Sequence, residues 1–154
     1  MANGLEFQSV EGGYQYLFVC ELEKAFDMPR GTLCDGMQQM ASHKAKEFKS
    51  KKNIVKMASN ILSQTQASLK AKYEKVLADW KTTNIGQMRA LVRLKFQEPH
   101  TRGVLLSTGS LTIEEAKERF GDSVWCRNAL GCSIPPQGYL GKILEDLRDE
   151  LSQL

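Results

Sequence analysis

Apolar side chains recur at helical spacing along the first third of the chain. The pattern predicts a helix over about 9–26, with Ser9 as a candidate N-cap, and the turn residues DMPRG at 27–31 close it. A second helix is predicted from a cap at Asp35 towards residue 48. The lysine-rich segment KSKKN at 49–53 has the composition of an exposed, mobile connection.

The middle of the chain continues with helical patterns. Residues 54–62 and 69–80 are predicted as two helices. Asn84 and Gln87 have the spacing of a capping box, which predicts a new helix ending before the pair Glu98-Pro99. The run GVLLSTG at 103–109, apolar between glycines, is predicted as a buried strand or a strand-like segment.

The last third combines two helices with a long irregular segment. Thr112 and Glu115 form a second possible capping box for a helix ending near residue 120, and a final helix is predicted over about 140–151. The intervening segment 121–138 contains Gly131, Gly138 and two prolines and is predicted as a long loop. Together the patterns predict a helix-rich α+β fold with few short strands, forming one domain over 1–154.

The composition is that of an ordinary globular domain. The 154 residues are 42% apolar and 25% charged, and no apolar stretch approaches the ~20 residues of a membrane span. The first residues have neither the basic nor the apolar region of a secretory signal, so we expect an intracellular, cytoplasmic protein without a membrane partner. No cofactor-binding signature is present, and no cofactor is expected.

The spacing of the four cysteines indicates no metal site. Cys20, Cys34, Cys126 and Cys132 are scattered, and the only close pair has five residues between its members, which fits neither a zinc knuckle nor a redox pair. We therefore expect reduced, mostly buried thiols and no metal site.

Charge is distributed unevenly along the chain, whose formal net charge is +3. Residues 44–96 hold thirteen basic and three acidic side chains (+10), whereas the flanking segments are acidic. Such a block attracts phosphates of a nucleotide or a nucleic acid, although lysines also commonly decorate solvated helices. Both interpretations stay open.

Two places combine a carboxylate with features of a ligand site. Glu11 precedes Gly12-Gly13 and could serve as a general acid or base, or could simply be a favourable charge near a helix N-terminus. Trp125 follows Asp122 in the long loop; it could be an ordinary core residue, or a flat wall on which a base or sugar stacks while Asp122 hydrogen-bonds it.

Several short motifs, kept in order, resemble the NADAR (YbiA-like) N-glycosidase family. The stretch SVEGGYQY, residues 9–16, resembles the family's helix-opening segment, with Glu11, Tyr14 and Gln15 in place. Further matches follow along the chain: Ala45-Lys46, Trp80, Met88, Lys95-Phe96, LLSTG at 105–109, Asp122-x-x-Trp125 and LGKILEDLR at 140–148. The chain resembles a divergent, N-terminally short member, with Gly12 and Phe18 where the family usually has histidine and lysine.

The resemblance implies cleavage of a bond between ribose carbon 1 and nitrogen without a metal. Implied substrates are ADP-ribose attached to guanine in nucleic acid, or a phosphoribosyl-amine metabolite. It implies catalytic roles for Glu11, Lys46 and Asp122, with Lys46 as the nearest match to a family lysine considered a Schiff-base nucleophile. Ligand-binding roles are implied for these residues: Tyr14, Gln15, Trp80, Lys95 and Trp125.

Two other functions remain open from the sequence. One is a module of the same fold that binds ADP-ribose or ADP-ribosylated nucleic acid without cleaving it. The other is an unrelated helical domain that binds nucleic acid or protein through the cationic block.

Overall fold

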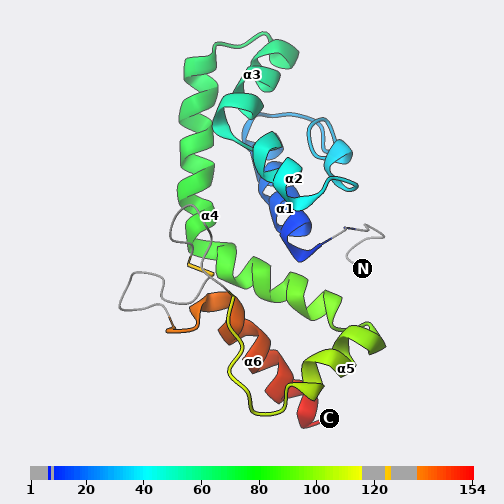
Figure 1. Ribbon diagram of the computed structural model, residues 1–154. Coiled ribbons are helices and arrows are strands. Elements are labelled where there is room, and N and C mark those ends of the chain that lie inside the picture. The colour runs from blue at the N-terminus through cyan, green and yellow to red at the C-terminus, as the bar shows by residue number, and fades with distance from the viewer. Residues whose placement is uncertain (1–6, 8, 116–123, 126–134) are drawn as a thin grey trace. The chain divides into compact units, whose positions relative to one another are not determined.

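A computed structural model describes residues 7, 9–115, 124–125 and 135–154. Within these residues the chain forms only helices, shown in order in Figure 1: α1 (Val10–Ala25), a single 3-10 turn η2 (Asp35–Met37), α2 (Ser42–Phe48), α3 (Lys51–Leu62), α4 (Gln66–Lys95), α5 (Pro99–Ser107) and α6 (Gly138–Ser152). None of these helices combines the length and hydropathy that a membrane span requires.

The helices gather into two compact units, Met1–Gln87 and Met88–Leu154, and the boundary falls inside α4. In the first unit α1 packs on α2, and α2 on α3; in the second α5 packs on α6 (Figure 1). The single domain predicted over 1–154 stays a prediction.

The first unit is built around α1, which is buried on most of its sides. Ser9 caps the helix by accepting a hydrogen bond from the Gly12 N–H at 3.0 Å, as the sequence predicted. Apolar side chains along its length form the centre of the core, with others from η2, α3 and α4: Phe18, Val19, Leu22, Phe26, Met37, Ile54, Val55 and Leu69. A helix buried in this way is held by packing rather than by a single amphipathic stripe.

The second unit shows why the predicted strand is wrong. Residues 99–107 are helical because the Glu98 carboxylate accepts from the backbone N–H groups of His100 and Thr101, and Pro99 occupies the first turn. This start signal outweighs the strand-like apolar run after it, so α5 contains Leu105 as a buried residue. The described part of the chain is therefore all-α, and the predicted α+β class is corrected.

Three other predicted boundaries change. The capping box expected at Asn84 lies inside α4, where intrahelical hydrogen bonds are continuous and the Asn84 side chain interacts with the Tyr14 hydroxyl instead. The helix expected from Asp35 to residue 48 is divided, because Ala41 is extended (φ −62°, ψ 150°) and α2 begins after it. The connection expected at 49–53 is shorter, since α3 begins at Lys51.

The last predicted helix is confirmed as α6, and its glycine has a packing role. A Cβ atom added at Gly141 would lie 2.0 Å from the Ile113 carbonyl oxygen, so only glycine lets residues 111–115 approach α6 so closely. The Glu145 carboxylate accepts from the Ile113 N–H at 2.9 Å, and Arg148 donates to the Leu111 carbonyl at 2.6 Å. Residues 112–115, the predicted start of the helix after Thr112, are not helical, and the rest of that prediction lies outside the described residues.

Candidate functional site

A hydrogen bond joins the start of α1 to the start of α2. Ser9 and Ser42, which flank or begin the two helices, have hydroxyl oxygens 2.7 Å apart. A Cβ atom added at Gly12 would lie 3.3 Å from the Ser9 hydroxyl oxygen and 3.9 Å from the Met40 carbonyl oxygen. A side chain at Gly12 would therefore press on the capping hydroxyl of Ser9 and would only be in ordinary contact with the segment before α2.

Two of the predicted catalytic residues meet at this junction. Glu11, in the first turn of α1, and Lys46, near the end of α2, form an ion pair with carboxylate oxygen and ammonium nitrogen 2.7 Å apart. Both side chains are partly exposed, at 39% for Glu11 and 44% for Lys46. A charged pair in that position is accessible to a ligand and is too exposed to add much stability by itself.

Lys49 completes the cluster and was missed by the sequence analysis. Its ammonium nitrogen lies 4.9 Å from the centroid of the Phe18 ring, in a cation–π contact. Burial lowers the pKa of Lys49, and the nearby charge of Lys46 lowers it further, while Glu11 acts in the opposite direction. The Tyr73 hydroxyl donates to the Lys49 carbonyl oxygen at 3.1 Å, which fixes the backbone at this residue.

The spacing of the lysines in the sequence could have indicated that Lys49 lies near Lys46. Lys46 and Lys49 are three residues apart, the spacing that places two side chains on the same face of a helix. The run KSKKN was instead interpreted as a mobile connection, so the lysine was not considered. The family resemblance implies a lysine where the chain has Phe18, and the Lys49 ammonium group lies beside the ring of Phe18.

Tyr14 and Trp80, predicted to bind a ligand, lie in the core. The Trp80 indole N–H donates to the Tyr14 hydroxyl at 2.8 Å, and the ring centroids are 5.2 Å apart. Trp80 also packs edge-on to Phe18 at 5.6 Å and is only 6% exposed. Burial raises the pKa of Tyr14. These two rings join α1 to α4, and their predicted contact with a ligand stays a prediction.

Gln15 is buried, at 3% exposure, one residue further along α1. Its side-chain oxygen has no hydrogen-bond partner among the residues that the structure describes. An amide oxygen in that state retains the capacity to accept from a ligand.

The other predicted site residues belong to the second unit. Lys95 is the exposed last residue of α4, and Trp125 is partly exposed. Asp122 lies outside the described residues. In the first unit the structure thus pairs Glu11 with Lys46 and Tyr14 with Trp80. The part of Lys95, Asp122 and Trp125 in a common site stays a prediction.

A surface groove lies beside α2 and the start of α3. It has a volume of about 510 Å³ and is lined by side chains from the segment before α2, from α2 and from the start of α3: Met40, Lys44, Glu47, Phe48, Asn53, Lys56 and Met57. Because the Met40 carbonyl also approaches Gly12, one end of the groove lies next to the start of α1. Its lysines could bind a phosphate group of a ligand.

No protein-family model, curated protein or solved structure matches the chain. The residues of the cluster supply a carboxylate, an ammonium group paired with it, and a second amine whose pKa is lowered.

Proposed function

We propose that the protein is an N-glycosidase that cleaves a bond between ribose carbon 1 and nitrogen. The first substrate to test is ADP-ribose linked to guanine in nucleic acid, and the second is a phosphoribosyl-amine metabolite. One observation carries the proposal: Glu11 and Lys46, assigned catalytic roles on sequence grounds and 35 positions apart, form an ion pair of 2.7 Å with Lys49 beside them.

The carboxylate of Glu11 suits the charge that develops in this reaction. As the bond from carbon 1 to nitrogen breaks, positive charge accumulates on carbon 1 and the ring oxygen, and a nearby carboxylate stabilises it. Lys46 holds this carboxylate at the junction of α1 and α2. The groove beside α2 offers further lysines to a phosphate.

Lys49 is the candidate nucleophile of this cluster. A neutral amine is required for attack, and both burial and the charge of Lys46 favour the neutral form of Lys49. Its nitrogen would bond to carbon 1 while the base leaves with a proton, and the sugar ring would then open to an imine. Water added to the imine carbon would release the sugar aldehyde and regenerate the amine.

The direct test is release of ADP-ribose from an oligonucleotide that carries ADP-ribosylated guanine. The wild-type chain should release ADP-ribose, and Glu11→Gln should slow release about 100-fold or more. Glu21→Gln, an exposed substitution on the same helix, is the matched control and should leave the rate unchanged. If Glu11→Gln and Glu21→Gln behave alike, Glu11 has no catalytic role.

Tight binding without release, in the same assay, would favour the non-cleaving module. High affinity for unmodified DNA that falls steeply with salt, with no competition by free ADP-ribose, would instead indicate a backbone-binding domain.

A further inference from the structure

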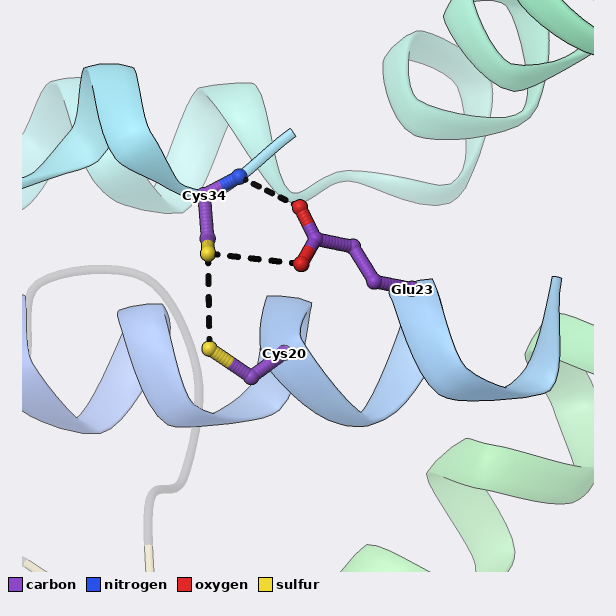
Figure 2. A group of neighbouring side chains, drawn as sticks. All are labelled: Cys20, Glu23 and Cys34. Carbon is purple, nitrogen blue, oxygen red and sulfur yellow. Dashed lines mark hydrogen bonds between the residues drawn. The ribbon is translucent and has the colours of Figure 1, made fainter. Parts of the chain in front are cut away.

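A second cluster of reactive side chains lies inside the first unit, between α1 and the loop that follows it. Figure 2 shows Cys20 and Glu23 on α1 pointing toward Cys34, which precedes η2. The two sulfur atoms are 3.4 Å apart, and the Cys34 sulfur is 3.4 Å from the nearer Glu23 carboxylate oxygen. One donor atom from each residue lies within 4.8 Å of the other two, and all three residues are buried.

The local sequence builds this cluster. Cys20 and Glu23 are three positions apart and so lie on the same face of α1. The chain returns over that face through two residues with positive φ, Asp27 (56°) and Gly31 (98°). This return places Cys34 above the carboxylate.

The Glu23 carboxylate is held in place by the loop. One oxygen accepts from the backbone N–H groups of Leu33 and Cys34, and the other accepts from the Gly31 N–H at 2.9 Å. Such outer hydrogen bonds orient a ligating group before a cation arrives. The oxygen nearer to Cys34 retains a lone pair, which in the metal-free protein faces the thiol.

Two of the three separations are close to those of tetrahedral coordination. With metal–sulfur bonds of about 2.3 Å and metal–oxygen bonds of about 2.0 Å, tetrahedral angles place two sulfurs about 3.8 Å apart and a sulfur and an oxygen about 3.5 Å apart. The two 3.4 Å separations in the protein need to change by only a few tenths of an ångström. The Cys20 sulfur and the carboxylate oxygen lie within 4.8 Å, and binding would bring them to about 3.5 Å. Three protein ligands leave a fourth position, and the Tyr16 side chain lies next to both thiols.

Charge balance also favours a divalent cation. The Cys20 thiol donates to the Cys34 sulfur, and the Cys34 thiol donates to Glu23. A divalent cation that displaces these two protons leaves the net charge of the buried cluster unchanged, so no additional net charge is buried. Two thiolates among three ligands select zinc-like, thiophilic cations over Mg²⁺ or Ca²⁺.

We infer that Cys20, Glu23 and Cys34 form a binding site for a thiophilic divalent cation of the Zn²⁺ class, which would tie α1 to the loop before η2. The site is separate from the Glu11–Lys46–Lys49 cluster, and the proposed glycosidase chemistry does not use it. Sequence spacing did not indicate it, because the two cysteines are fourteen positions apart and become neighbours only through the fold.

The test is a Co²⁺ titration of the full chain, first treated with a chelator and kept reduced with a phosphine. The expected result is a thiolate-to-cobalt absorption band that saturates at one equivalent and disappears when Zn²⁺ is added. Cys20→Ser and Cys34→Ser should each remove most of the band, while Cys126→Ser and Cys132→Ser should keep it. No band, or a band that survives Cys34→Ser, would overturn the inference.

A second measurement covers the case in which the serine variants do not fold. Cysteine alkylation of the wild-type chain in moderate urea, mapped by mass spectrometry, should slow at Cys20 and Cys34 when Zn²⁺ is present and should not change at Cys126 and Cys132. Equal rates with and without Zn²⁺, or protection of the other pair, would contradict the assignment.

Discussion

Replacing Glu23 by alanine should be among the most destabilising single changes in the first unit. The side chain is 1% exposed, and its carboxylate accepts three backbone N–H groups, from Gly31, Leu33 and Cys34. Leu33 and Cys34 are themselves buried, so alanine would leave two N–H groups with neither a carboxylate nor water. These groups have no alternative acceptor unless the loop moves.

The expected loss of stability follows from the number of backbone N–H groups that lose their hydrogen-bond acceptor. A buried polar group left without a hydrogen bond costs about 1–3 kcal/mol, which gives about 2–6 kcal/mol for two such groups. A domain has about 5–15 kcal/mol of stability in total, so a loss of this size is a large share of it. Glu23→Gln should cost less, because it keeps one carbonyl oxygen as an acceptor.

Urea unfolding followed by circular dichroism measures the difference. Glu21→Ala is the matched control, because Glu21 is on the same helix, is exposed and forms an exposed ion pair with Lys24 at 2.7 Å. It should change the free energy of unfolding by no more than about 0.5 kcal/mol. Equal losses for Glu23→Ala and Glu21→Ala would refute the claim that the carboxylate organises the loop.

Three further changes test the packing described above. Burial of Asp146 raises the pKa of its carboxyl, but the hydrogen bonds and charges of two cationic partners outweigh burial and lower the pKa. The ionised carboxylate therefore stabilises the fold above the ordinary pKa of about 3.9, and this stabilisation is lost at lower pH. In urea unfolding, Asp146→Asn should cost about 0.5–1 kcal/mol at pH 7 and nothing at pH 2. Gly141→Ala should destabilise by about 1–3 kcal/mol because of the clash with a carbonyl oxygen, whereas Gly103→Ala, with open space around it in α5, should stabilise slightly; thermal melts with the opposite order would contradict this. Trp80→Phe removes the hydrogen bond to the Tyr14 hydroxyl and should cost about 1–2 kcal/mol, and an unchanged melting temperature would show that this bond is not needed.

The helices with strong local signals could be predicted from the sequence. Ser9 has the side chain of an N-cap and caps α1, and the apolar stripe of the final segment forms α6. The segment 103–109 was assigned wrongly because its glycines and apolar run resemble a strand, whereas the capping carboxylate of Glu98 lies five positions earlier. The glycines and apolar residues of 103–109 therefore had less effect on the backbone conformation than the helix-capping carboxylate before them.

The candidate site was predictable only in part. Glu11 and Lys46 were selected by motif, and the fold brings them into contact. Lys49 was overlooked, because its importance depends on burial and on the neighbouring charge of Lys46, which a lysine-rich string does not reveal. The Cys20–Cys34 contact depends on a loop return and could not be inferred from spacing.

The most direct test of the central claim is to trap the covalent intermediate. The chain is mixed with an ADP-ribosylated guanine oligonucleotide and borohydride, which reduces an imine between lysine and the opened sugar, and the modified lysine is identified by mass spectrometry. We predict an adduct on Lys49, lost in Lys49→Arg and kept in Lys52→Arg, because a guanidinium group keeps the charge but does not form this imine. Release of ADP-ribose without any adduct, or an adduct on another lysine, would contradict the account.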